Sequence, residues 1–194
     1  MLQFATSESS HFSIREQVEM AIKAGIRWIR LSGCIAESIV NELIPICQES
    51  DTILILDNDI KLVDKLRIHG VHLTQWTRGE VIATREELGP HAIVGLTCDN
   101  PSNFNELSGL DIDYIVIQNP ASEAPIDYYK KATEHLRNSN KEIHAVAEGD
   151  GLPIAIYPTL IASGIEGFEL SGSILNAPDP SAFISLAMQA NNHI

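Results

Sequence analysis

Short apolar runs of strand length alternate with segments of helical periodicity eight times along the 194 residues of this chain. Two examples are Ile-Leu-Ile-Leu at 53–56 and Tyr-Ile-Val-Ile at 114–117, which are apolar throughout. Strands without polar alternation are typical of parallel sheets that helices cover on both faces. The pattern therefore predicts an α/β fold. The eight runs that we interpret as strands are 2–5, 26–31, 52–56, 71–73, 92–96, 113–117, 152–156 and 167–170.

Helix signals separate these runs. Ser13 and Glu16 have the spacing of a capping box, in which the two side chains satisfy free backbone N–H groups of the first turn. Gly25 is placed to end that helix, and Asp179 followed by Pro180 is typical of the start of another. Besides these two, the segments that we interpret as helical are 35–47, 57–66, 80–88, 101–107, 128–137, 141–148 and 159–163.

Two architectures fit this alternation, a closed (β/α)₈ barrel and an open doubly wound sheet. The open sheet carries a glycine-rich phosphate-binding turn after its first strand. Here the first run leads into Thr-Ser-Glu-Ser-Ser at 6–10, which contains no glycine. The number of strands also favours closure. We therefore predict a compact, single-domain (β/α)₈ TIM barrel over residues 1–194, smaller than the ~250 residues typical of that fold.

Composition argues against several classes of function. Thirteen basic and 26 acidic residues give a formal charge of −13, and no basic patch for nucleic acid is evident. Cys34, Cys47 and Cys98 are too scattered for a disulfide framework. No apolar run approaches the ~20 residues that a membrane span requires, and the first residues lack a signal-peptide pattern. We expect a cytoplasmic protein that binds neither nucleic acid nor membrane.

A barrel of this kind carries its functional residues at the C-terminal ends of its strands. Polar residues follow most of the predicted strands and are therefore candidates for a site. The candidates for catalysis are Asp57, Asp59 and Asp99. The candidates for substrate binding are Ser32, Cys34, Asn58, Gln75, Thr97, Gln118, Thr159, Ser171, Gly172 and Ser173.

Each acidic candidate has two interpretations. Asp57 and Asp59 offer the oxygen ligands that Mg²⁺ prefers, but an aspartate before a helix is also a common N-cap. Asp99 likewise precedes a helix with Pro101 at its first position. We favour the capping interpretation for all three, with a metal or catalytic role as the alternative.

The remaining candidates are also open. His72 lies inside an apolar run, which favours a hydrogen-bonded interior histidine over a catalytic base. Cys98 would be a nucleophile only with a base beside it, and none is evident in the sequence. The turn at 171–173 follows the last strand, where two hydroxyls and free N–H groups would cradle a phosphate. The alternative is an ordinary tight turn.

Several segments carry a resemblance to a known family. The run LILDNDIKLV at 54–63 is followed by GVHLTQ at 70–75, with QVEMAIKAG at 17–25 and REELGPHAIVG at 85–95. In order and spacing they resemble the thiamine-phosphate synthase family, with its I-N-D-x-x-D-L-A and G-V-H-L-G-Q motifs. That family includes a side branch, the TenI-like thiazole tautomerases. The resemblance covers nearly the whole chain and implies a (β/α)₈ barrel.

The resemblance also implies chemistry. Synthases of this family are transferases of thiamine biosynthesis that join a pyrimidine pyrophosphate to a thiazole phosphate with Mg²⁺, whereas the tautomerases keep the barrel without that synthesis. By resemblance we expect a small-molecule ligand, phosphorylated in the family, and Mg²⁺ as the cofactor. A homo-oligomer and a protein partner from the thiamine pathway stay open.

The chain departs from the family at its functional positions. The family's arginine and lysine after strand two fall on Ser32 and Cys34, and its two Mg²⁺ aspartates fall on Asn58 and Thr77. Its loop lysine after strand six has no counterpart in 118–127, and we align its I-G-G-I phosphate loop with Tyr-Pro-Thr-Leu at 157–160. The sequence therefore predicts a degenerate pyrophosphate and metal site with little or no synthase activity. The alternative is a non-catalytic barrel that binds a small molecule or has a regulatory or scaffold role.

Overall fold

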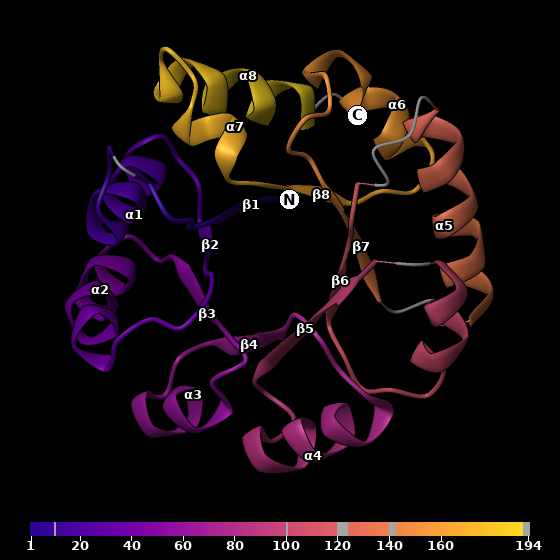
Figure 1. Cartoon of the computed structure of the whole chain (residues 1–194), viewed down its shortest axis with the longest axis horizontal. Helices are drawn as coiled ribbons and strands as arrows, with labels where there is room; N and C mark the ends of the chain where they lie inside the picture. Colours follow the sequence, from indigo (N-terminus) through magenta and orange to yellow (C-terminus); the bar gives the residue numbers. More distant parts are fainter. Residues whose placement is uncertain (10, 100, 120–123, 140–142, 192–194) are drawn as a thin grey trace.

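Eight parallel strands form a closed barrel in the computed structural model of the chain (Figure 1). The strands follow one another in sequence order, and β8 pairs with β1 to close the ring. This confirms the predicted (β/α)₈ barrel. The structure describes residues 1–9, 11–99, 101–119, 124–139 and 143–191. The strands are β1 (Leu2–Ala5), β2 (Trp28–Leu31), β3 (Ile53–Asp57), β4 (Gly70–Leu73), β5 (Ile93–Cys98), β6 (Tyr114–Ile117), β7 (His144–Glu148) and β8 (Gly167–Leu170).

Helices surround the barrel (Figure 1). The capping box predicted at Ser13 is present, because the Glu16 N–H donates to Ser13 Oγ and the Ser13 N–H donates to the Glu16 carboxylate. In the described part of the chain, no helix is long and apolar enough to cross a membrane. The helices are α1 (Ile14–Lys23), α2 (Glu37–Glu49), α3 (Ile60–Leu66), α4 (Arg78–Leu88), α5 (Pro125–Ser139), α6 (Tyr157–Ala162), α7 (Gly172–Leu175) and α8 (Pro180–Asn191), with 3₁₀ turns η1 (Pro101–Leu107) and η2 (Ile154–Ile156).

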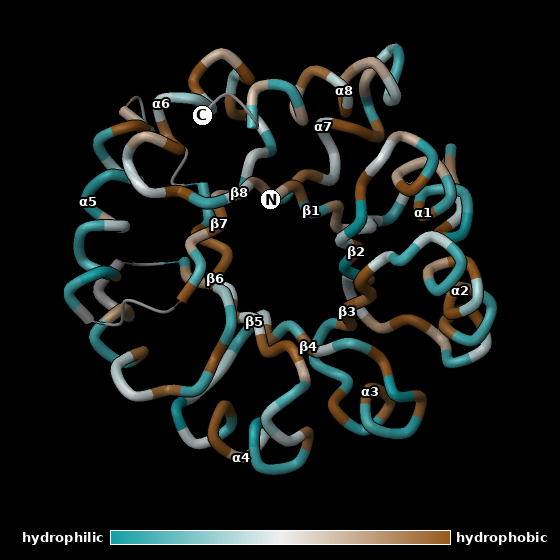
Figure 2. Tube along the Cα trace, turned by 180° about the vertical axis from the view of Figure 1, so that it is seen from behind, coloured by the Kyte–Doolittle hydropathy of each residue, from teal (hydrophilic) through white to brown (hydrophobic). Residues whose placement is uncertain are grey.

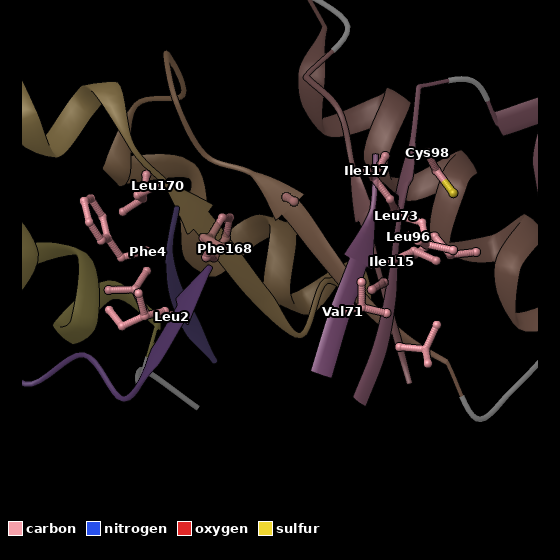
Figure 3. Close-up of a cluster of buried hydrophobic side chains, with 14 of the residues drawn as sticks. Leu2, Phe4, Val71, Leu73, Leu96, Cys98, Ile115, Ile117, Phe168 and Leu170 are labelled. Carbon is pink, nitrogen blue, oxygen red and sulfur yellow. The ribbon is translucent and has the colours of Figure 1, made fainter. Parts of the chain in front are cut away.

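The main hydrophobic core lies between the strands and the helices. Figure 3 shows side chains of β1, β4, β5, β6 and β8 that belong to this core, among them Phe4 and Phe168, both fully buried. Phe168 stacks on Tyr157 of α6 with ring centroids 3.7 Å apart. Figure 2 shows that α2, α3 and α5 carry both hydrophilic and hydrophobic stretches, as helices with one buried face should.

Most apolar residues of the strands are buried. Ile29, Ile55, Val94 and Val116 are buried, while Ile53 at the start of β3 is half-buried. Because side chains alternate along a strand, every second residue faces the barrel axis. Val116 belongs to a second, smaller apolar cluster, separate from the main core, together with other β6 and β7 residues.

The seventh strand corrects the sequence prediction. We predicted a helix over 141–148 and a strand over 152–156, but β7 is His144–Glu148 and Ile154–Ile156 is the 3₁₀ turn η2; residues 141 and 142 lie outside the described part. His-Ala-Val-Ala-Glu pairs in register with β6 and β8, for example Val146 with Val116 and with Gly167. Backbone pairing on both sides determines this strand, despite alanines of low β-propensity.

Candidate functional site

Charged side chains gather inside the barrel near the C-terminal ends of the strands. Nε of Arg30 (β2) is 3.5 Å from Oδ1 of Asp57 (β3), and its Nη2 is 3.3 Å from Oε1 of Glu169 (β8). These side chains are 12%, 4% and 8% exposed. Glu148, at the end of β7, is the register neighbour of Glu169, and its Oε2 accepts the Asn119 N–H at 2.8 Å. We call Arg30, Asp57, Glu148 and Glu169 the charged ring.

Burial shapes the electrostatics of the charged ring. It raises the pKa of Glu169 to about 7, opposed by Arg30 and reinforced by neighbouring carboxylates. Burial also raises the pKa of Asp57, against the effects of Arg30 and of the Gly33 N–H. Within the described part of the chain, Oε2 of Glu169 and Nη1 of Arg30 have no hydrogen-bond partner. Buried polar atoms without partners are rare, so the ring is where a ligand or ordered water is expected.

A hydrogen-bonded chain crosses the interior beside the ring. Gln3 Nε2 donates to the Tyr114 hydroxyl at 3.3 Å, which lies 2.9 Å from Nδ1 of His72. Nε2 of His72 lies 2.8 Å from Oγ1 of Thr97. Burial lowers the pKa of His72 well below its usual value. The structure thus agrees with the interior interpretation of this neutral, fully hydrogen-bonded histidine, and it brings the candidate Thr97 to the interior.

The three candidates at the end of β3 and in the loop after it, Asp57, Asn58 and Asp59, have different structural roles. Asp59 caps α3, since its Oδ1 accepts the Leu62 N–H at 3.0 Å, which confirms the capping interpretation. Asn58 exchanges two hydrogen bonds with Thr74, at 2.9 and 3.0 Å. Asp57 is not a helix cap, so that interpretation is wrong: as the last residue of β3 it faces inward, where Arg30 and the Gly33 N–H hold it.

The neighbouring loops carry exposed or neutral candidates. Ser32 is half-buried and its N–H donates to Thr6 Oγ1 at 3.0 Å, whereas Cys34 is exposed. Gln75, after β4, is also exposed. Thr77 is the N-cap of α4 and forms a capping box with Glu80. Among the described residues, no group of three or more His, Cys, Asp or Glu side chains is arranged to hold a metal ion.

The ends of β5 and β6 bring three further candidates to the same end of the barrel. Asp99 and Gln118 are exposed, and the Gln118 N–H donates to the Cys98 carbonyl at 3.0 Å. Cys98 is buried, as predicted for an inert thiol, and burial, with the nearby Asp99 carboxylate, raises its pKa to about 12. A thiol with that pKa is protonated at neutral pH and is a poor nucleophile.

The corrected position of β7 changes which segment of this chain corresponds to the family's phosphate loop. The segment after β7 is Gly149-Asp150-Gly151-Leu152, so a glycine-rich loop is present there and our alignment to 157–160 is wrong. Thr159 does not follow a strand; it is exposed in α6. Ser171, Gly172 and Ser173 do follow β8, and all three N–H groups donate to the Asp150 carboxylate.

Four residues that dominate the site were not among the candidates predicted from the sequence: Arg30, Glu148, Asp150 and Glu169. A signal was available, because Arg30 and Glu169 interrupt apolar strands at inward-facing positions, and a charged residue in such a strand is seldom left unpaired. The alternation of strand residues would have placed both inside the barrel. It would not have shown that they form an ion pair across β1.

Two cavities lie at the opposite end of the barrel, where the strands begin. They measure about 320 and 280 Å³ and share Met1 and Trp28 in their walls. His144 Nδ1 pairs there with Glu166 Oε2 at 2.6 Å, whereas Trp28 Nε1 and Asn191 Oδ1 have no hydrogen-bond partner among the described residues. The N-terminal end of such barrels contributes to stability rather than to function, so we place the candidate site at the charged ring.

Comparisons with known proteins agree with this architecture. The family model for thiamine monophosphate synthase matches residues 2–167. The chain belongs to this family. It is 29% identical over 195 residues to the thiamine-phosphate synthase of Bacteroides thetaiotaomicron, covering 93% of this chain and 92% of that protein. The thiamine-phosphate synthase of Bacteroides fragilis is 30% identical over 193 residues, covering 92% and 94%.

A solved structure supports the fold of this family member. The thiamine phosphate pyrophosphorylase from Pyrococcus furiosus superposes with a TM-score of 0.78 over 98% of this chain and 94% of that one. The two sequences are 18% identical, so this likeness concerns the fold and not the site.

Proposed function

We propose that this chain is a thiamine-phosphate-synthase-like barrel that binds a thiazole- or pyrimidine-type small molecule of thiamine metabolism at its charged ring, without catalysing the synthase reaction. The observation that carries the proposal is the environment of Arg30. It is the one cation of the ring, and Asp57 and Glu169 already neutralise it. Family membership supports the ligand class, since relatives are named as thiamine-phosphate synthases.

The positions that hold pyrophosphate in the family support the absence of synthesis. By resemblance, arginine and lysine side chains stand there, whereas Ser32 and Cys34 carry no positive charge here. The family's loop lysine also has no counterpart in 118–127, which makes three lost cations. Each charge-assisted contact contributes about 1.5–3 kcal/mol, so their loss would cost about 5–9 kcal/mol. The departing pyrophosphate gains charge in the transition state, where fixed cations normally stabilise it.

The metal donors of the family are also replaced. The family normally uses Mg²⁺, but Asp57 is ion-paired inside the barrel, Asn58 bonds Thr74, and Thr77 caps α4. Mg²⁺ is usually bound through one or two carboxylates together with water and phosphate. The residues at these positions therefore do not fit that ion.

An activity assay tests this proposal. Purified protein with the pyrimidine pyrophosphate, the thiazole phosphate and Mg²⁺ should form little or no thiamine phosphate. The double variant Ser32→Arg/Cys34→Lys should gain affinity for pyrophosphate without full turnover, because Thr77 still lacks a carboxylate. Turnover by the wild-type protein in the ordinary range of ~1–10³ per second would overturn the proposal.

A further inference from the structure

Asp150 ties the loop after β7 to the loop after β8. Its Oδ1 accepts the N–H groups of Ser171 and Ser173 at 3.1 and 3.0 Å, and its Oδ2 accepts that of Gly172 at 2.8 Å. Consecutive backbone N–H groups that converge on one point form the kind of concavity that binds phosphate. In this protein a carboxylate of the chain itself already receives all three hydrogen bonds.

The backbone around Asp150 holds the carboxylate in this position. The Gly149 N–H donates to the Glu169 carbonyl at 2.7 Å, and a Cβ at Gly149 would come within 2.8 Å of neighbouring side chains. Gly151 has a φ of +79°, which favours glycine. Asn119 Nδ2 donates to the Asp150 carbonyl at 3.2 Å. Because folding fixes this loop, the carboxylate competes with an outside anion as a group that is already in place.

The charged ring next to this loop opposes an anion as well. A phosphate that displaced Asp150 would meet its carboxylate, with those of Glu148 and Glu169 close by. Glu148 and Glu169 are register neighbours in the barrel, and Asp150 follows Gly149, whose N–H donates to the Glu169 carbonyl. Like charges held close together in a partly buried site repel one another.

The same ring offers acceptors for a positively charged ligand. Glu169 is more than nine-tenths buried, and its Oε2 has no hydrogen-bond partner among the residues that the structure describes. Asp57 and Glu148 also belong to the ring, so it holds three acidic side chains and one cation, Arg30, while Asp150 lies in the adjoining loop. A carboxylate with a free oxygen accepts hydrogen bonds from the N–H groups of a protonated or amino-substituted heterocycle. The excess negative charge of the site attracts a positively charged heterocycle.

We infer that Asp150 is a built-in substitute for a ligand phosphate, so that this barrel selects an unphosphorylated nitrogen-heterocycle cation over the phosphate ester of the same compound. This inference rests on the proposed function, because it takes the charged ring as the place where the ligand binds. It goes further in naming the residue that sets the ligand class.

Thiamine and thiamine phosphate are suitable probes, because both contain the thiazolium cation and they differ by one phosphate. Isothermal titration calorimetry of the wild-type protein should give at least about tenfold tighter binding of thiamine than of thiamine phosphate. Inorganic phosphate alone should bind the Asp150→Gly variant at least about tenfold more tightly than the wild type. Asp150→Asn provides a second variant that retains an oxygen acceptor, and it should gain phosphate affinity in the same direction.

The matched control is Asp179→Asn. Asp179 Oδ1 also accepts a helical N–H, that of Ala182, but it lies at the start of α8 outside the ring. This variant should bind phosphate as the wild type does. The inference is overturned if the wild type prefers thiamine phosphate, or if neither Asp150 variant gains phosphate affinity. Gain of phosphate binding by both variants, without binding of either thiamine compound to the wild type, would support the role of Asp150 while overturning the proposed function.

Discussion

The two faces of the same eight strands have opposite chemistry. The outward face is apolar and packs against the helices, as Phe4, Leu73 and Phe168 illustrate (Figure 3). The inward face carries Arg30 and Glu169 near the C-terminal ends of the strands, although most such barrels fill that space with branched apolar side chains. The comparison indicates that the outward face stabilises the fold, whereas the buried charges of the inward face reduce stability and form the candidate site.

The largest effect should come from the outward face. Phe168→Ala should lower the free energy of unfolding by about 3–5 kcal/mol, because it removes a fully buried ring and leaves a cavity beside Tyr157. Urea denaturation measures the change. Leu186→Ala, at a site that is 56% exposed, is the control and should change stability by less than about 0.5 kcal/mol. Similar losses in the two variants would contradict the division between the faces.

The inward face should respond to the loss of its cation. Arg30→Met should cost about 3 kcal/mol at pH 8, because it leaves Asp57 and Glu169 buried without a positive partner. Adding Glu169→Leu should recover part of that loss, since it removes one of the unpaired charges. Thermal or urea unfolding of the two variants provides the test. If Arg30→Met alone were as stable as the wild type, the ion pair would have no structural role.

The pH dependence of stability should sharpen the same comparison. The pKa of Glu169 is about 7 in the folded protein, above its ordinary value of 4.5, so its contribution to stability is fully present at low pH and is lost as the pH rises from about 5 to about 7. The groups that set this pKa, apart from burial, are Arg30, Asp57, Glu148 and Asp150, and Glu169 in turn influences Tyr114.

Glu169→Gln should remove this slope. The difference in unfolding free energy between wild type and variant should change by about 2 kcal/mol between pH 5 and pH 7.5, in favour of the variant at the higher pH. The exposed Glu37, which pairs with Lys65, gives the matched control Glu37→Gln with no such slope. Parallel pH profiles for wild type and Glu169→Gln would contradict a raised pKa at Glu169.

The outward face was predicted from the sequence, whereas the charged inward face was missed, although Arg30 and Glu169 interrupt apolar strands and so carried a signal for it. The apolar runs predicted the strands of the barrel, and the capping box at Ser13 predicted the start of α1. These predictions succeeded because the local sequence preferences agree with the parallel sheet that forms. The strand over 144–148 was missed, because its alanines have no local preference for a strand. Its pairing with β6 and β8 determines the strand conformation. The task of Asp150 depends on a contact with residues more than 20 positions away, which no local pattern contains.

The smallest effect concerns Asp59, in the loop after β3. For Asp57 and Asp59 the sequence allowed two hypotheses, that they bind a metal ion or that they cap a helix. Asp59→Ala should lower stability by about 1 kcal/mol, because it removes the acceptor for the Leu62 N–H at the start of α3. Thr77→Ala, at the N-cap of α4, is the matched control and should cost a similar amount.

Titration with Mg²⁺ distinguishes the metal-binding hypothesis from the capping hypothesis. A specific ligand at about 100 times its dissociation constant adds ~2.7 kcal/mol of stability, which is a readable shift in melting temperature. We expect no shift when Mg²⁺ is titrated into the wild type or into Asp59→Ala, because Asp59 is used as a cap and Asp57 is ion-paired with Arg30. A Mg²⁺-dependent increase that Asp57→Ala abolishes would mean that Asp57 leaves Arg30 to bind the ion. The inward face would then hold a metal site, and the charge argument for a cationic ligand would fail with it.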